Sequence, residues 1–218
     1  MRKLETDRSI TQRERMVWDQ LERRGIRNPD LLGAMRETPR HLFVPENVRP
    51  MAYEDHALQI GHGATISQPY IVAFMTGLLR PNRQQRILEI GTGSGYQAAI
   101  LAQLSAQVYS IESIPELAES AAATLQELGY LNVVVREGDG YQGWPEMAPF
   151  DGIIVTAAPP QVPEALVDQL AMGGRMVVPV GPKRVQQLML IEKKPDGRVE
   201  RRSLDEVTFI PMVPAPLV

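Results

Sequence analysis

One stretch of the sequence constrains the fold more than any other. It reads Arg86-Ile87-Leu88-Glu89-Ile90-Gly91-Thr92-Gly93-Ser94-Gly95-Tyr96, an apolar run followed by three glycines at alternate positions. A helix-forming segment, 97–104, comes next, so the order predicts a strand, a tight turn and a helix. Glycines suit such a turn because they adopt positive φ and let a ligand lie against the backbone. The start of the helix offers N–H groups to an anionic ligand group, which indicates a nucleotide-like cofactor.

The spacing of the glycines narrows the choice of cofactor. The pattern is G-x-G-x-G, and Tyr96 stands where a dinucleotide motif has its third glycine, which makes a dehydrogenase the weakest alternative. An acid still closes the next predicted strand, 106–111, because Glu112 follows it directly. A carboxylate there can accept hydrogen bonds from both hydroxyls of a ribose. The combination resembles the class I S-adenosylmethionine methyltransferases and implies S-adenosyl-L-methionine as the cofactor.

Composition excludes several classes of function. The 218 residues are 44% hydrophobic, enough for one good core with a small appendage. A net charge of −3 offers no basic footprint for nucleic acid. The chain has no cysteine, which removes disulfides, zinc–thiolate sites and a cysteine nucleophile. No signal peptide or membrane-length apolar run is evident, so we expect a cytoplasmic protein that binds neither membrane nor nucleic acid.

Strand and helix patterns alternate from Gln68 onward. This alternation predicts an α/β fold with a doubly wound, mostly parallel Rossmann-like sheet. After the glycine turn and Glu112, a capping box of Ser113 and Glu116 predicts a helix that stops at Gly129. Two strands near the C-terminus, split by a turn at 195–197, are expected to pair antiparallel. The expected strands are 86–90, 106–111, 131–136, 150–157, 175–180, 186–193 and 207–213, and helices are also expected at 70–79 and 162–170.

Residues 1–60 read as a helical N-terminal extension packed on the core. Thr11 and Glu14 form a capping-box pattern for a helix ending at Gly25, and Asn28 begins a second helix that stops near Thr38. Residues 41–63 read as a structured loop. We therefore expect a single domain overall, with the extension at 1–60 and the S-adenosylmethionine-dependent methyltransferase unit at 61–218.

In such sheets the ligand lies beyond the carboxyl ends of the strands. Asp139, between two glycines after the third strand, can accept a hydrogen bond from an adenine amino group, or it is an ordinary Asp-Gly turn. Glu89 either anchors the amino group of the methionine part or braces the turn. Residues 157–160 read Ala-Ala-Pro-Pro, without the Asn or Asp that methylation of a base amine would need. Cytosine C5 chemistry would need a cysteine, so we expect an acceptor other than a nucleobase.

A second motif reads Gly61-His62-Gly63-Ala64-Thr65-Ile66-Ser67-Gln68-Pro69-Tyr70. Taken alone it passes as a loop entering a helix, with Ser67 as the cap. Gly63 to Pro69 is nevertheless similar to the protein-L-isoaspartate O-methyltransferase family, and the likeness covers about residues 10 to 213. The segments that carry the rest of the resemblance are Arg40 with Phe43-Val44-Pro45, the run 150–159, Val162–Leu166 and the run 173–181.

The resemblance implies a protein repair enzyme. Family members methylate the free α-carboxylate of isoaspartyl residues in damaged proteins, and the ester cyclises to a succinimide that hydrolyses partly to aspartate. Ser67 matches the family's active-site serine, and Ala64 to Ser67 matches a loop that touches cofactor and substrate. Tyr70 departs from the His of some members, and Ile210-Pro211-Met212 departs from Val-Pro-Leu. The predicted cofactor-binding set is Ala64, Thr65, Ile66, Ser67, Glu89, Gly91, Thr92, Gly93, Gly95, Glu112, Gly138 and Asp139.

The expected chemistry needs no general base. A carboxylate with a pKa near 4 is ionised at pH 7 and can attack a sulfonium methyl in line, so the protein mainly positions the reactants. Ser67 is therefore interpreted as a positioning residue that donates a hydrogen bond to the substrate carboxylate. His41, His56 and His62 are expected to be structural or exposed, with no metal site. We expect a monomer acting on isoaspartyl proteins and peptides, and leave open activity on D-aspartyl residues, a small-molecule methyltransferase and a non-catalytic nucleoside-binding module.

Overall fold

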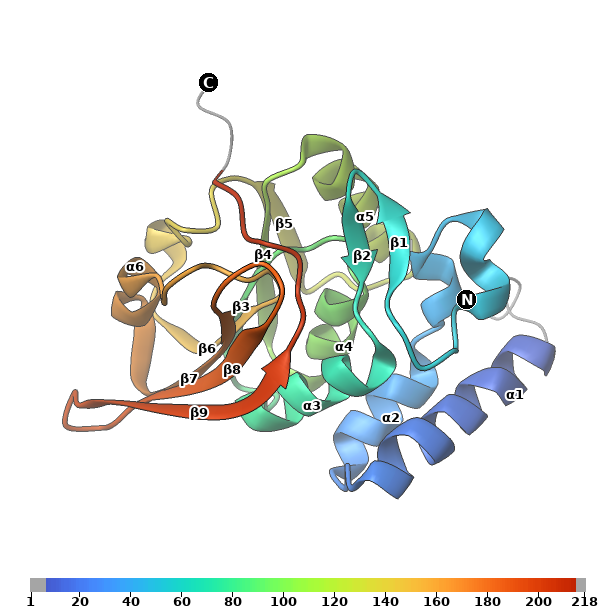
Figure 1. Ribbon diagram of the computed structural model, residues 1–218, viewed down its shortest axis with the longest axis horizontal. Helices are drawn as coiled ribbons and strands as arrows, with labels where there is room; N and C mark the ends of the chain where they lie inside the picture. The colour runs from blue at the N-terminus through green and yellow to red at the C-terminus, as the bar shows by residue number, and fades with distance from the viewer. Residues whose placement is uncertain (1–6, 215–218) are drawn as a thin grey trace.

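The computed structural model describes residues 7–214, which are built around a seven-stranded sheet (Figure 1). The strand order is β5-β4-β3-β6-β7-β8-β9. The first five of these strands run parallel, whereas β8 pairs antiparallel with β7 and with β9. This arrangement confirms the predicted fold class. The strands are β3 (Arg86–Ile90), β4 (Gln107–Glu112), β5 (Val133–Glu137), β6 (Phe150–Val155), β7 (Leu170–Val180), β8 (Gln186–Lys193) and β9 (Val199–Val207).

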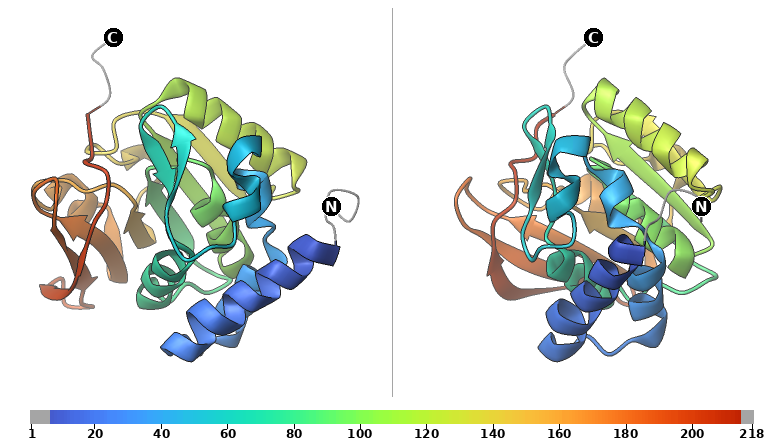
Figure 2. Two further views of the ribbon diagram at one scale, coloured as in Figure 1. Left: turned by 45° about the vertical axis from the view of Figure 1, so that its right-hand side comes forward. Right: turned by 90° about the vertical axis from the view of Figure 1, so that its right-hand side faces the viewer.

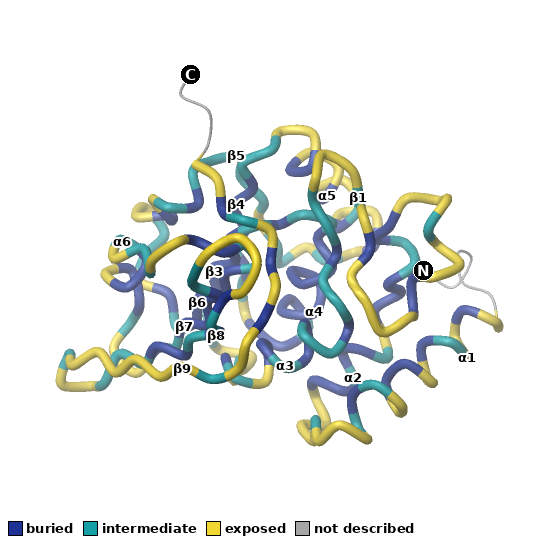
Figure 3. Tube along the Cα trace, viewed as in Figure 1, coloured by how far each residue is buried: buried dark blue, intermediate teal, exposed yellow. Residues whose placement is uncertain are grey.

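The two faces of the sheet contribute to separate hydrophobic cores. Along β3, Ile87 belongs to one core and Leu88 to the other, because successive side chains of a strand point to opposite faces. The first core contains α3 (Pro69–Leu79), α4 (Tyr96–Leu104) and α5 (Pro115–Glu127), and the second contains α6 (Glu164–Asp168). Both cores close on the same central strands, so the carboxyl ends of β3, β4 and β6 are held rigidly side by side. Figure 3 shows this buried centre and, in contrast, the exposed edge strand β9.

The N-terminal segment packs against α3 and α4 (Figure 2). It consists of α1 (Asp7–Arg15), a π-helical stretch η1 (Met16–Leu21), a 3₁₀ turn η2 (Glu22–Arg24), α2 (Pro29–Glu37) and two further 3₁₀ turns, η3 (Arg40–Phe43) and η4 (Glu46–Met51). Its predicted start at Thr11 is wrong: Thr11 lies inside α1, where its hydroxyl donates to the Asp7 carbonyl oxygen. The predicted stop at Gly25 is confirmed by a φ of 94°.

The second predicted N-terminal helix is confirmed at both ends. Asn28 accepts a hydrogen bond from the Leu31 N–H at 3.0 Å and Thr38 follows the last residue of α2. The segment predicted as a loop at 41–63 instead ends in a strand, β1 (Leu58–Gly61), which pairs antiparallel with β2 (Ala64–Ile66). This hairpin stands over the carboxyl ends of the sheet (Figure 1).

The last predicted strand is the largest error. The chain forms β9 at Val199–Val207, which pairs antiparallel with β8 as expected, but residues 208–213 leave the sheet. They cross its carboxyl edge and form one isolated bridge, between Pro211 and Ala158. Within residues 7–214, no helix is long and apolar enough to cross a membrane.

Candidate active site

The turn after β3 has the backbone that its glycines predict. Gly91, Gly93 and Gly95 have φ values of 93°, 53° and 84°, a region that other residues rarely adopt. A Cβ on Gly91 would lie 2.6 Å from the Thr156 hydroxyl oxygen, so the turn also lies directly against the end of β6. The turn therefore presents bare backbone at the point where β3, β4 and β6 end.

Glu112 organises this turn from the end of β4. Its carboxylate accepts hydrogen bonds from the backbone N–H groups of Gly93 at 2.8 Å, Ser113 at 2.9 Å and Ile114 at 3.1 Å. The last two residues directly precede α5 (Pro115–Glu127). The predicted capping box of Ser113 and Glu116 is wrong, because the N-cap residue of α5 is Ile114 and makes no side-chain cap hydrogen bond. Three backbone donors fix the carboxylate, which lines the cavity described below.

Glu89 is buried next to the glycine turn and does not line the cavity. Its side chain is fully buried, and one carboxyl oxygen accepts a hydrogen bond from the Ser110 hydroxyl, which is itself 2.6 Å from the Thr92 hydroxyl. Burial, reinforced by the nearby charge of Glu112, raises the pKa of Glu89 to about 8 although the Ser110 hydrogen bond lowers it. Glu89 is thus a neutral acid at pH 7 that links β3 to Ser110 of β4, and the choice between its two predicted roles stays a prediction.

The loop after β5 lies at the same edge of the sheet. The Gly138 N–H donates to the Glu112 carbonyl oxygen at 2.9 Å, and the Asp139 carboxylate accepts from the Tyr141 N–H at 3.0 Å. The Tyr141 hydroxyl then donates to the Met212 carbonyl oxygen at 3.1 Å. Asp139 shapes the turn in this arrangement, and Gly140 is the loop residue that lines the cavity.

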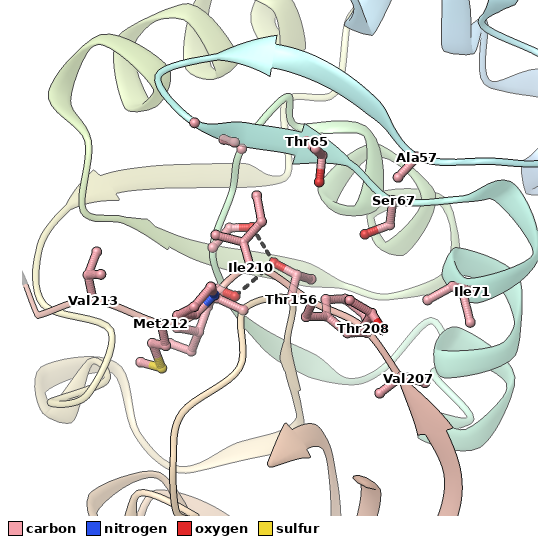
Figure 4. Close-up of a pocket in the computed structure, with 18 of the residues that line it drawn as sticks. Ala57, Thr65, Ser67, Ile71, Thr156, Val207, Thr208, Ile210, Met212 and Val213 are labelled. Carbon is pink, nitrogen blue, oxygen red and sulfur yellow. Dashed lines mark hydrogen bonds between the residues drawn. The ribbon is translucent and has the colours of Figure 1, made fainter. Parts of the chain in front are cut away.

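The hairpin of β1 and β2 supplies the opposite wall. Its turn, 61–63, has positive φ at all three residues, including His62 at 51°. Ser67 follows β2 directly and precedes α3, which begins at Pro69. Figure 4 shows Thr65 and Ser67 projecting from this wall toward the segment that carries Thr208 and Ile210.

Residues 208–213, which the sequence predicted to be part of a strand, form the third wall. The Ala158 N–H donates to the Ile210 carbonyl oxygen at 2.8 Å, and the Met212 N–H donates to the Ala158 carbonyl oxygen at 2.9 Å. These bonds hold the segment across the end of β6, beside Thr156 (Figure 4). The signal that was available is Pro211, which cannot donate to a sheet ladder and argues against a regular strand.

The three walls enclose one cavity of about 800 Å³, within the usual range of ligand sites. Of the predicted cofactor-binding residues, six line it: Ala64, Thr65, Ser67, Gly91, Gly93 and Glu112. The other six are not among its lining residues: Ile66, Glu89, Thr92, Gly95, Gly138 and Asp139. Lining residues outside the predicted set include His56, Ala57, Ile71, Thr156 and the segment 207–213.

Two of the three histidines lie at the cavity. His56 and His62 line the cavity, whereas His41 is 2.7 Å from the Tyr53 hydroxyl. The Ala57 carbonyl and then the Glu54 carboxylate raise the pKa of His56 above its usual value. Among residues 7–214, no group of three His, Cys, Asp or Glu side chains is arranged to hold a metal ion.

Sequence comparison relates the chain to one family of proteins. A family model described as protein-L-isoaspartate(D-aspartate) O-methyltransferase matches residues 11–215. The protein-L-isoaspartate O-methyltransferase of Synechococcus sp. (strain JA-2-3B'a(2-13)) is 55% identical over 215 residues, covering 95% of this chain and 88% of the relative. The one of Opitutus terrae (strain DSM 11246 / JCM 15787 / PB90-1) is 56% identical over 200 residues, covering 92% and 86%.

Two solved structures agree with these relatives. One, named protein-L-isoaspartate O-methyltransferase, superposes with a TM-score of 0.84 at 34% identity and covers 91% of this chain, which spans 65% of that structure's length. The other is a Plasmodium falciparum protein described as an isoaspartate methyltransferase in complex with S-adenosyl-L-homocysteine; it has a TM-score of 0.79 at 26% identity and covers 92% of this chain and 98% of the other. The chain therefore belongs to the protein-L-isoaspartate(D-aspartate) O-methyltransferase family.

Proposed function

We propose that the protein transfers the methyl group of S-adenosyl-L-methionine to the free α-carboxylate of L-isoaspartyl residues in damaged proteins. The product is a methyl ester that cyclises to a succinimide. The observation that carries the proposal is the continuity of the cavity: the glycine turn with Glu112 and the loop with Ser67 line the same space. Donor and acceptor can therefore meet there without rearrangement of the sheet.

The donor end fits a nucleoside cofactor. Gly91 and Gly93 line the cavity with backbone alone, and Glu112 is held by three N–H donors with oxygen lone pairs still available to ribose hydroxyls. We propose that these residues hold S-adenosyl-L-methionine, which supplies an electrophilic methyl group when bound. Of the remaining predicted residues, Thr65 and Ala64 would contact it from the hairpin. Thr92, Gly95, Gly138, Glu89, Ile66 and Asp139 would support the site from behind.

At the acceptor end, Ser67 positions the substrate. The substrate carboxylate is ionised at pH 7, so it is already nucleophilic and requires no proton removal. The Ser67 hydroxyl, at the end of β2, can donate a hydrogen bond to one carboxylate oxygen and aim the other at the methyl group. This orientation is the main catalytic contribution that the chain itself makes.

The decisive experiment compares two peptides that differ only in one isoaspartyl linkage. We expect labelled methyl groups from S-adenosyl-L-methionine in the isoaspartyl peptide and almost none in the aspartyl peptide. Equal labelling would refute the specificity. If a small molecule is the true acceptor, an excess of isoaspartyl peptide will not compete with its methylation.

A substitution at Ser67 tests its role. Loss of a hydrogen bond to a charged group costs about 1.5–3 kcal/mol, so Ser67→Ala should lower kcat/KM for the isoaspartyl peptide roughly 10- to 150-fold. The affinity for S-adenosyl-L-homocysteine should stay within about twofold. Ser203→Ala, on the exposed strand β9, is the control and should be silent. A large loss of cofactor affinity in Ser67→Ala would make Ser67 a cofactor residue instead.

We also propose that residues 1–60 are an extension of a single domain. The same hydrophobic core contains Met16 and Phe43 from the extension and Leu101 from α4, which supports this division. The ends of the range, at 1–6 and 215–218, lie outside the described residues. We propose a monomer that acts in the cytoplasm. The net charge of −3 supports a protein that does not bind nucleic acid.

A further inference from the structure

One side chain of the N-terminal segment contacts residues at and beside the cavity. Arg24, the last residue of η2, places its guanidinium carbon 3.4 Å from the centre of the Tyr70 ring. Its Nη1 atom lies 3.1 Å from a carboxylate oxygen of Asp55. Tyr70 belongs to the first turn of α3, three residues after Ser67, and Asp55 lines the cavity. Arg24 therefore contacts one residue that lines the cavity and one that lies in the helix turn next to Ser67.

A third contact closes these two into a ring. The Gln68 side-chain amide donates to the Asp55 carbonyl oxygen at 3.0 Å, and Gln68 also lines the cavity. The ring runs from Arg24 to Asp55, across to Gln68, along the backbone to Tyr70, and back to Arg24. It includes Gln68, which directly follows Ser67 in the short connection between β2 and α3. The path of this connection is thus held from outside the cavity as well as by its own strand and helix.

Tyr70 is a fixed platform for the guanidinium. Its ring stacks on Phe74, one turn further along α3, with an interplanar angle of 7° and a centroid distance of 5.8 Å. A guanidinium over an aromatic face is attracted by the ring quadrupole, and its planar shape suits stacking. This contact depends on the tyrosine that departs from the His of some family members.

The arrangement contributes geometry more than stability. The side chains of Arg24 and Asp55 are 41% and 42% exposed, so solvent screens their ion pair. An error of about 1 Å in the placement of a reacting group can nevertheless lower a rate about a hundredfold. The ring of contacts lies where such an error would matter, at the backbone that carries Ser67.

We propose that Arg24 is a positioning residue for methyl transfer. It fixes the first turn of α3 and the Asp55 segment, and through them sets where Ser67 and Gln68 meet the substrate carboxylate. The inference rests on the proposed function and adds that the N-terminal extension is part of the acceptor site.

The test uses the whole chain and a neighbouring arginine as the matched control. Arg23 is next to Arg24 on the same 3₁₀ turn and pairs with Asp19 at 3.4 Å, and neither residue lines the cavity. Arg24→Leu should lower kcat/KM for the isoaspartyl peptide roughly 5- to 30-fold and leave the affinity for S-adenosyl-L-homocysteine within about twofold. Arg23→Leu should match the wild type, and Arg24→Lys should recover part of the loss.

Two further variants separate the platform from the hydroxyl of Tyr70. Tyr70→Phe keeps the ring and should behave as the wild type, whereas Tyr70→Leu should reproduce Arg24→Leu. If Arg24→Leu is indistinguishable from Arg23→Leu, or if cofactor affinity falls as much as peptide turnover, the inference is overturned.

A readout without substrate keeps the inference separate from the proposed function. Hydrogen exchange of the segment 64–72 should be faster in Arg24→Leu than in Arg23→Leu. Unchanged exchange there refutes the positioning role whatever the acceptor is. A wild type that fails to methylate the isoaspartyl peptide refutes the proposed function instead.

Discussion

The buried acid Glu89 makes the stability of the protein depend on pH in a predictable direction. Its pKa rises from 4.5 to about 8 on folding, because the folded state buries the carboxyl group completely. Between these two values the folded chain holds a proton that the unfolded chain has released. The stabilisation is therefore fully present below pH 4.5 and is lost as the pH rises through 8.

The magnitude follows from the linkage relation. Each pH unit in this window changes the free energy of unfolding by about 1.4 kcal/mol per proton. From pH 6 to pH 8 the contribution of Glu89 to the free energy of unfolding falls by about 2 kcal/mol. The fall is smaller than two full pH units would give, because Glu89 also begins to ionise in the folded state as the pH approaches 8. Glu89→Gln removes this pH dependence of the free energy of unfolding, because an amide does not titrate. It keeps an oxygen that can accept a hydrogen bond from the Ser110 hydroxyl.

Urea unfolding of both proteins at pH 6, 7 and 8 measures the effect. We expect the wild type to lose about 2 kcal/mol more than Glu89→Gln between pH 6 and pH 8, because other titrating groups are common to both. Glu119→Gln, at an exposed position of α5, is the control and should follow the wild type. If the curves for Glu89→Gln and wild type are parallel, Glu89 is ionised in the folded protein and the reasoning fails.

Two further predictions concern the walls of the cavity. Glu112→Gln replaces a carboxylate that accepts three backbone hydrogen bonds, so the Kd for S-adenosyl-L-homocysteine measured by calorimetry should rise about 10- to 150-fold; an unchanged Kd would contradict its assignment. Gly91→Ala combines a φ of 93° with a Cβ 2.6 Å from the Thr156 hydroxyl and should lower the free energy of unfolding by more than about 2 kcal/mol. Gly129→Ala has a similar φ and nothing within 4 Å, so it should lose only about 1 kcal/mol, and equal losses would show that the contact with Thr156 is harmless.

Local sequence patterns predicted the structure correctly where the residue type strongly favours one conformation. Three alternate glycines led to positive φ at each position, and Asn28 before Pro29 led to a capped helix start. The capping boxes at Thr11 and Ser113 failed because their side chains are common in several settings. Before α5 the stronger acceptor is Glu112, one residue before Ser113. Its carboxylate accepts from the N–H groups of Ser113 and Ile114 and also from the Gly93 N–H of the glycine turn.

The sequence by itself determined the donor side of this protein. Short-range backbone preferences specify the strand, turn and helix around Gly91 and the acid at Glu112. Such preferences can be recognised from consecutive residues of the sequence. On the acceptor side the sequence indicated Ser67, but only the tertiary structure decided that residues 55–57, 67 and 208–213 meet, although more than 150 residues separate the first from the last. No local preference encodes such a meeting. It results from β9 ending at the sheet edge and from Ala158 offering its N–H and carbonyl groups to the departing chain.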